Sequence, residues 1–265
     1  MTKYPCNSIS LEYAVFNDVV DSFIGQKVII NCLDKEIIGQ VESCDLQQAK
    51  VRLFGNVNRF VVSKTTGNFM EGFVEIPLSP SILGRQLDFF GNSVDDLPPI
   101  IPVSKTVSFY TKLEVNIANK SQIVSDKDWL IVSEDFKIQK GDVKSHKDFS
   151  TLLPLLSISN IALLVVEMDY QSKKFKNLQQ LLVDNNLDQI SIFFQSQSQN
   201  DIALAPSCIS QVANYLASHL GFDVLIVVAH SEQLKNTNIN EFYFARNIEQ
   251  LASIDANNSI TIINL

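Results

Sequence analysis

The sequence lacks the long apolar segments of membrane proteins and the charge of nucleic-acid-binding proteins. Its longest strongly apolar runs, 161–166 and 224–229, are about a third of the roughly 20 residues that a membrane-spanning helix needs. The first 25 residues carry acidic side chains where a secretory signal has its apolar stretch. Lys and Arg number 21 against 29 Asp and Glu, a net charge of -8, which disfavours binding to phosphate backbones. We expect a cytoplasmic protein without membrane insertion or a nucleic-acid partner.

Cysteine and histidine are also scarce. The four cysteines show no close pair, which favours reduced thiols over a disulfide framework or a zinc site; they are Cys6, Cys32, Cys44 and Cys208. The histidines are His146, His219 and His230, and the motifs HExxH and GxSxG are absent. Zinc hydrolases and serine or cysteine triads therefore lack their parts. His219 lies near a helix C-terminus, where a charged imidazole is mildly favourable. His230 directly follows a strand, where a hydrogen-bonded structural role is favoured over a catalytic one.

Glycine placement divides the chain into two parts. Seven of the nine glycines precede residue 92, among short β-rich runs at 27–32, 36–43, 49–55 and 59–64. This spacing predicts a small antiparallel barrel or sandwich. The proline-rich segment 95–104 can join neither a helix nor a central strand. We predict an N-terminal β-barrel domain over 1–78 and a junction with a proline-rich linker over 79–104.

The remainder, 105–265, alternates apolar strands with amphipathic helices. Continuous apolar runs predict buried strands at 161–166, 190–194, 224–229 and 259–264. Helical spacing of apolar residues predicts intervening helices within 171–186, 206–220 and 240–252, the second closed by Gly221. Three consecutive β-α-β crossovers imply a parallel α/β sheet.

Ligands of open parallel sheets bind beyond the carboxyl ends of the strands, but the sequence offers little chemistry there. Glu167 and Asp169 follow an apolar strand, where a carboxylate could bind a metal ion or act as a general base. Acidic residues at strand ends are, however, also common on protein surfaces. The two glycines with the spacing of a phosphate-binding P-loop, Gly67 and Gly72, are followed by Phe73 instead of Lys. We interpret that spacing as coincidence.

A resemblance to a known family begins at Ser79. The segment SPSILGRQLDFFGNSVDDLPPIIP resembles the rotary ATPase subunits at the junction between their N-terminal barrel and nucleotide-binding domain. The matching junction residues, for which the resemblance implies a structural role, are Leu83, Gly84, Arg85, Gly91 and Asp95. Upstream, 36–60 resembles the barrel hairpins of that family. The resemblance implies a β-barrel followed by a P-loop-NTPase-like α/β domain.

The segment KIQKGDVKSHKD is similar to the degenerate phosphate loop of the V-type B subunit. His146 and Asp148 match the end of that loop, and with Gly141 and Lys144 they form a candidate phosphate-loop remnant. The chain departs from the family at the central strand, which in the family ends in an acidic pair but here ends in Ala229 and His230. The chain also ends before the family's arginine finger and C-terminal helical domain. We therefore expect no ATP hydrolysis.

The resemblance implies a non-catalytic B-subunit-like component of a V-type proton-translocating ATPase that packs against a catalytic A-type subunit. Through such a complex the chain would lie at the membrane periphery. The alternative is a stand-alone pseudo-ATPase that acts as an interaction or regulatory module, alone or as a homo-oligomer. No cofactor is expected under either hypothesis. A third hypothesis is weak residual ATP or ADP binding through Gly141, Lys144 and His146.

Overall fold

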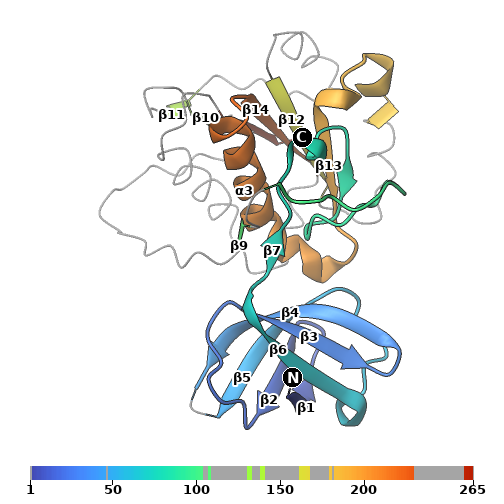
Figure 1. Cartoon of the computed structure of the whole chain (residues 1–265), viewed down its shortest axis with the longest axis vertical. Helices are drawn as coiled ribbons and strands as arrows, with labels where there is room; N and C mark the ends of the chain where they lie inside the picture. The colour runs from blue at the N-terminus through green and yellow to red at the C-terminus, as the bar shows by residue number, and fades with distance from the viewer. Residues whose placement is uncertain are drawn as a thin grey trace. The chain divides into compact units, whose positions relative to one another are not determined.

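The computed structural model describes residues 2–45, 47–103, 107–108, 130–132, 138–140, 161–167, 179–180, 182–229 and 260–264. Two compact units are present (Figure 1). The first contains the described residues of 2–75 together with Ser108 and 197–201, and the second contains the described residues of 76–107, 130–196 and 202–264. The predicted domain limits at residues 78 and 104 stay predictions.

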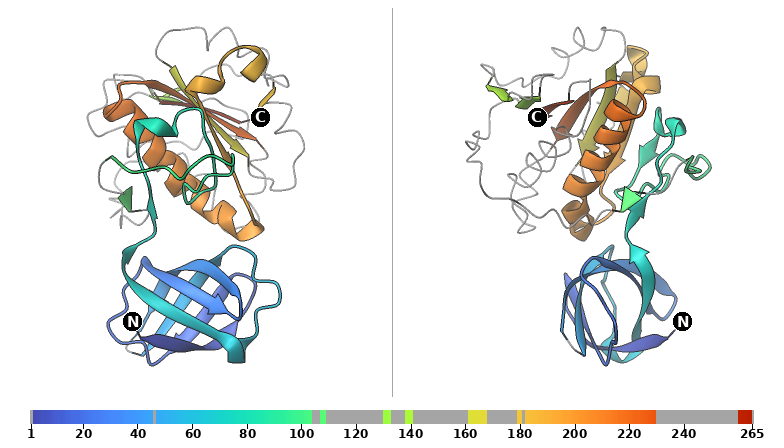
Figure 2. Two further views of the ribbon diagram at one scale, coloured as in Figure 1. Left: turned by 45° about the vertical axis from the view of Figure 1, so that its right-hand side comes forward. Right: turned by 60° about the vertical axis from the view of Figure 1, so that its left-hand side comes forward.

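The first unit is a closed antiparallel barrel (Figure 2). Its strands are β1 (Lys3–Ile9), β2 (Tyr13–Asn17), β3 (Gln26–Cys32), β4 (Lys35–Cys44), β5 (Gln48–Phe54) and β6 (Thr65–Phe73). The strands follow one another around the barrel in the order β1-β2-β5-β4-β3-β6, and β1 pairs with β6 to close it. The predicted β-barrel is confirmed.

The predicted strand over 59–64 is wrong. Residues Val62–Lys64 form a 3-10 turn, and β6 begins only at Thr65, which pairs with Cys32. Two bonds hold the loop in this conformation: the backbone N–H of Val61 donates to Cys32 Sγ at 3.4 Å, and Thr65 Oγ1 donates to the Val61 carbonyl at 2.8 Å. These contacts remove the Val61 backbone from any strand ladder.

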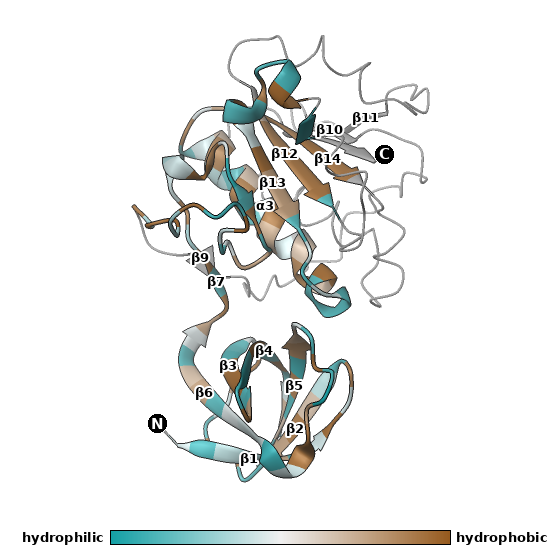
Figure 3. Cartoon of the chain, turned by 90° about the vertical axis from the view of Figure 1, so that its right-hand side faces the viewer, coloured by the Kyte–Doolittle hydropathy of each residue, from teal (hydrophilic) through white to brown (hydrophobic). Residues whose placement is uncertain are grey.

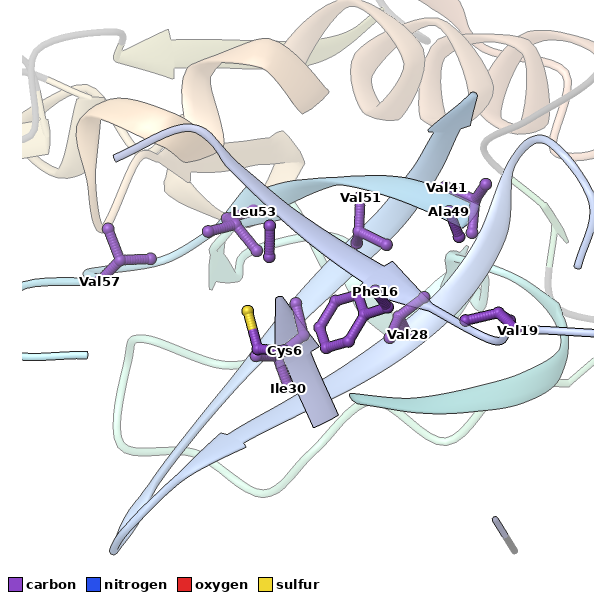
Figure 4. Packing of buried hydrophobic residues seen from close by; sticks show 11 residues of the cluster. Cys6, Phe16, Val19, Val28, Ile30, Val41, Ala49, Val51, Leu53 and Val57 are labelled. Carbon is purple, nitrogen blue, oxygen red and sulfur yellow. The ribbon is translucent and has the colours of Figure 1, made fainter. Parts of the chain in front are cut away.

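Alternating side chains fill the barrel. In β3 every second residue is buried, as expected for a strand with one face toward a core. Figure 4 shows Phe16 near the centre, with Val19, Val41 and Ala49 toward one end and Val57 toward the other. Phe16 meets Phe69 edge to face, with ring centroids 5.7 Å apart. The barrel interior is therefore packed with side chains.

The second unit is built on a mixed seven-stranded sheet. Its order is β11-β10-β15-β14-β12-β13-β8, formed by β8 (Gln86–Leu87), β10 (Leu130–Val132), β11 (Ile138–Lys140), β12 (Ile161–Glu167), β13 (Ser191–Gln195), β14 (Asp223–Ala229) and β15 (Ile260–Asn264). The strands from β15 to β8 are parallel, whereas β10 runs antiparallel to both β15 and β11. Two short strands, β7 (Glu75–Ile76) and β9 (Val107–Ser108), form a separate pair.

The parallel strands are apolar, as Figure 3 shows for β12, β13 and β14. Residues 162–166 are fully buried, because parallel strands are covered on both faces. Helix α3 (Ala205–Ser218) packs on β12 and β14 with a stripe formed by Cys208, Ile209, Val212, Ala213 and Leu216. Gly221 ends this segment with a positive φ of 73°, which lets the Phe222 N–H donate to the Leu216 carbonyl.

The parallel α/β sheet is confirmed. The observed β12, β13, β14 and β15 match the four predicted strands to within a residue or two. Of the predicted helix within 171–186, residues 179–180 and 182–184 are described and helical. The predicted helix over 240–252 lies outside the described residues. No helix in the described part of the chain is long and apolar enough to cross a membrane.

Candidate functional site

The junction motif begins with a tight turn that leads into the edge of the sheet. Ser79 precedes a 3-10 turn over Pro80–Ile82, and its Oγ accepts a hydrogen bond from the Ser81 N–H at 3.3 Å. Leu83 ends this turn. Gly84 then adopts a φ of 79°, and its N–H donates to the Ser191 carbonyl at 2.8 Å. Glycine suits this left-handed backbone because it has no Cβ.

The motif continues as β8, which adds a strand to the sheet. The Phe193 N–H donates to the Arg85 carbonyl at 2.9 Å, and β8 runs parallel to β13. The sequence did not predict this two-residue strand. The junction segment therefore covers the β13 edge of the parallel sheet.

Arg85 and Asp95 form a buried ion pair within the motif. Arg85 Nε lies 2.7 Å from Asp95 Oδ2, and Nη2 donates to Oδ1 at 3.0 Å. The two side chains are only 11% and 8% exposed. Asp95 also accepts the N–H groups of Gln86 and Leu97, at 2.9 and 3.2 Å. The hydrogen bond from Arg85 lowers the pKa of Asp95 to about 2, so the carboxylate is charged at neutral pH.

Arg85 also holds the proline-rich segment. Its Nη2 donates to the Ser93 Oγ at 2.6 Å and to the Pro98 carbonyl at 2.9 Å. The Ser93 hydroxyl donates to the same carbonyl at 3.3 Å. A proline carbonyl remains a full acceptor although proline lacks an N–H. The guanidinium therefore ties the beginning of the motif to the start of the proline-rich segment.

Gly91 lets the turn between these two parts approach β7. It has a φ of 78°, and an added Cβ would lie 2.7 Å from Pro77 Cδ and 2.8 Å from Ile76 Cγ1. Asp88 holds the same turn, because its carboxylate accepts the N–H groups of Phe90 and Asn92 at 2.8 and 2.9 Å. Burial raises the pKa of Asp88. Asp88 was not among the predicted site residues, although an Asp at the first position and a Gly at the fourth, as in Asp88 and Gly91, are typical of a β-turn.

The structure thus brings Gly84, Arg85, Gly91 and Asp95 together with Leu83 in one loop. The arrangement contains no nucleophile with an adjacent base. Its polar groups are directed at backbone N–H groups and carbonyls of the same loop. Its chemistry is that of a structural clamp.

The carboxyl edge of the parallel strands is a second candidate site. Glu167, fully buried at the end of β12, is in register with Gln195 on β13 and Ala229 on β14. The chain passes from β13 to β14 on the other side of β12, so this edge is a topological switch point, where such sheets bind ligands. Asp169 and His230 lie outside the described residues.

The candidate phosphate-loop remnant, Gly141, Lys144, His146 and Asp148, also lies outside the described residues. Gly67 and Gly72, which have P-loop spacing, lie within strand β6 of the barrel, whereas a phosphate loop joins a strand to a helix. His219 follows α3 and stacks on Tyr215 with ring centroids 5.4 Å apart. All four cysteines are free thiols. Among the residues described, no group of three or more His, Cys, Asp or Glu could hold a metal ion.

Comparison with known proteins relates part of the chain to a rotary ATPase subunit. No protein-family model matches the chain. A segment of 93 residues is 32% identical to the V-type ATP synthase beta chain of Nitrosococcus oceani (strain ATCC 19707). It covers 34% of this chain and 19% of that protein, so the chain spans about a fifth of the relative's length. The match supports a distant relationship to this rotary ATPase subunit.

Proposed function

We propose that the chain is a non-catalytic, B-subunit-like component of a V-type proton-translocating ATPase. The single observation that carries this proposal is the 93-residue match to a V-type ATP synthase beta chain. The order of the fold agrees with it, because a closed β-barrel is followed by a parallel sheet. The partner in this proposal is a catalytic A-type subunit.

The proposal that the chain is non-catalytic is supported by two places where its residues differ from those that ATP hydrolysis requires. Phosphoryl transfer needs a phosphate-binding loop and a carboxylate that orders Mg²⁺. In this chain β14 ends at Ala229, and the glycine pair with P-loop spacing belongs to a barrel strand. Neither feature can supply the charge stabilisation that the reaction needs.

Copurification from native cells tests the assembly. A tagged chain should retain V-type ATP synthase subunits, with the catalytic A-type chain prominent in mass spectrometry. The Asp95→Ala variant breaks the junction clamp. It should retain fewer ATPase subunits if the clamp holds the conformation that binds them. Recovery of the wild-type chain without any ATPase subunit would contradict the proposal and would fit a stand-alone interaction module.

Phosphate release tests the second part. The purified chain with ATP and Mg²⁺ should release no more phosphate than a heat-denatured sample. Calorimetric titration of ATP and ADP then reports on any residual site. We expect binding weaker than about 100 μM, which corresponds to roughly -5.5 kcal/mol. Turnover that survives further purification would contradict a non-catalytic role.

A further inference from the structure

The proline-rich segment 97–103 of the second unit exposes a contiguous run of apolar side chains. Ile101 is 79% exposed and Val103 is 75% exposed. The exposed residues of the segment are Leu97, Pro98, Pro99, Ile101, Pro102 and Val103. Exposed apolar side chains that adjoin one another are typical of an interaction surface, whereas single ones are not.

The backbone of this segment favours a polyproline II helix. Residues 98–102 lie in no helix, strand or turn, and no residue from 97 to 103 has a positive φ. Each proline holds its own φ at about -65° and disfavours the helical region for the residue before it. The prolines also donate no N–H, so the segment is a poor partner for strand pairing.

Contacts at both ends hold the segment in place. Arg85 Nη2 donates to the Pro98 carbonyl at 2.9 Å, and the Val103 N–H donates to the Leu78 carbonyl at 3.3 Å. Between these ends the side chain of Ile100 is only 6% exposed, so it anchors the middle of the segment to the fold. A segment that is preorganised in this way loses little conformational entropy when it binds a partner.

The burial of Ile100 determines which edges of the segment face solvent. In a polyproline II helix, with about three residues per turn, residues 98 and 101 share one edge, 99 and 102 share a second, and 100 lies on the third. The two edges without Ile100 carry the dipeptides Pro98-Pro99 and Ile101-Pro102, which are exposed. A groove with two shallow pockets can therefore take both dipeptides while Ile100 points into its own fold.

The sequence contains a second pair of prolines with the same spacing, Pro77 and Pro80. There the neighbouring side chains Ile76, Leu78 and Ser79 are at most 3% exposed, so a groove cannot reach them in the folded chain. The structure thus distinguishes two segments that the proline spacing alone does not, and it favours Pro99 and Pro102.

We propose that segment 97–103 is the docking site for a partner protein with a proline-binding groove lined by aromatic side chains, as SH3 domains have. The exposed charge next to the segment is negative, because Asp96 is exposed whereas Asp95 is paired with Arg85. The groove should therefore carry a Lys or Arg at the end that meets Asp96. The inference uses residues of the second unit only and does not depend on the proposed ATPase role.

Nuclear magnetic resonance titration tests this docking. A panel of purified, isotope-labelled SH3 domains with Lys or Arg beside the groove is titrated with the unlabelled full chain. At least one domain should show shifts confined to its aromatic groove. The expected dissociation constant is about 100 μM, since the contact is small and transient.

Substitutions in the full chain identify the segment that is bound. Pro99→Ala and Pro102→Ala should each weaken binding about tenfold, because each removes a ring from one pocket. Pro80→Ala is the matched control, since it makes the same change at an exposed proline of the other pair and should leave binding unchanged. Asp96→Asn, which tolerates the φ of 56° at this position, should weaken binding about threefold and reduce its salt dependence.

Three outcomes would overturn the proposal. One is a panel in which no domain binds the wild-type chain more tightly than about 1 mM, ten times the expected dissociation constant. Another is binding that both Pro99→Ala and Pro102→Ala leave unchanged. The third is equal weakening by Pro80→Ala and Pro102→Ala, which would show that the spacing in segment 97–103 is not what the groove recognises. Circular dichroism of each variant establishes that the fold is retained.

Discussion

Two Arg–carboxylate pairs, one on the barrel and one in the junction loop, differ in what they hold. On the barrel, Arg52 lies 3.4 Å from Glu42, with the side chains 21% and 35% exposed. In the junction, Arg85 lies 2.7 Å from Asp95, and both side chains are nearly buried. Exposed pairs contribute little to stability, whereas breaking a buried pair leaves an uncompensated charge.

The partners of each pair explain the difference further. Glu42 binds side chains only: Lys50 Nζ at 2.7 Å, the Tyr13 hydroxyl at 3.0 Å and Arg52. These residues lie on β2, β4 and β5, which are already paired through their backbones. Asp95 and Arg85 instead bind backbone groups of an irregular loop. The junction pair therefore determines a backbone conformation, and the barrel pair does not.

The largest effect should follow from breaking the junction pair. Asp95→Ala leaves Arg85 buried without its counter-ion and frees the Gln86 and Leu97 N–H groups. We expect a loss of about 3 kcal/mol in the free energy of unfolding of the second unit. Urea denaturation followed by circular dichroism measures this loss, and hydrogen exchange of the 83–99 segment locates it. Glu42→Ala is the control; equal losses in the two variants would contradict the distinction between the pairs.

Gly91→Ala should disturb the same loop without changing any charge. Its positive φ costs about 1 kcal/mol for alanine, and the contact of the new Cβ with Pro77 adds about 1–2 kcal/mol of overpacking. Gly84→Ala is a close control, since Gly84 has nearly the same φ of 79° but its nearest neighbour would be 3.9 Å away. Denaturation of both variants separates the contact from the backbone strain. Equal losses would show that the close approach to Pro77 carries no cost.

The elements that the sequence predicted correctly are those with a strong local pattern. Strands β12 and β14 are continuous apolar runs, and α3 shows a regular stripe closed by glycine. Strand β1 was missed because exposed residues dominate its seven positions. Strand β8 was missed because two residues carry no periodicity, and only pairing with β13, about a hundred residues away, defines them.

The junction residues show the same limit. A resemblance could name Arg85 and Asp95, but not the acceptors and donors that complete the clamp. These partners are the Pro98 carbonyl and the N–H groups of Gln86 and Leu97. Every residue has a backbone carbonyl and every residue except proline has a backbone N–H, so the sequence does not mark them. Their selection depends on the turn that Gly91 and Asp88 produce. Whether Gly141, Lys144, His146 and Asp148 form a phosphate site stays a prediction.

The pH dependence of stability should distinguish Asp95 from other carboxylates. Its pKa is about 2 in the folded chain and about 3.9 when unfolded. Ionised Asp95 therefore stabilises the folded state above about pH 4. About 2 kcal/mol of this contribution to the free energy of unfolding is lost as the pH falls toward 2. Asp88 acts in the opposite direction, because burial raises its pKa. The difference between wild type and Asp95→Asn isolates the Asp95 contribution.

Urea denaturation of both proteins between about pH 5 and pH 2.5 measures that difference, which should shrink with falling pH as Asp95 becomes protonated. Asp95→Asn keeps the shape of the side chain but accepts fewer charged hydrogen bonds from Arg85. A difference that stays constant over this range would mean that the wild-type advantage does not arise from the ionised carboxylate.

The smallest effect should come from the barrel pair. Burial opposes ionisation of Glu42, but hydrogen bonds from Lys50 and Tyr13 lower its pKa overall. Even so, Glu42→Gln should change the free energy of unfolding of the barrel by at most about 0.5 kcal/mol, since salt and water screen exposed charges. The strands β4 and β5 remain paired by their backbones. Thermal denaturation in low and high salt checks this: a loss above about 1 kcal/mol that disappears in salt would show that the surface network contributes as much as a buried pair.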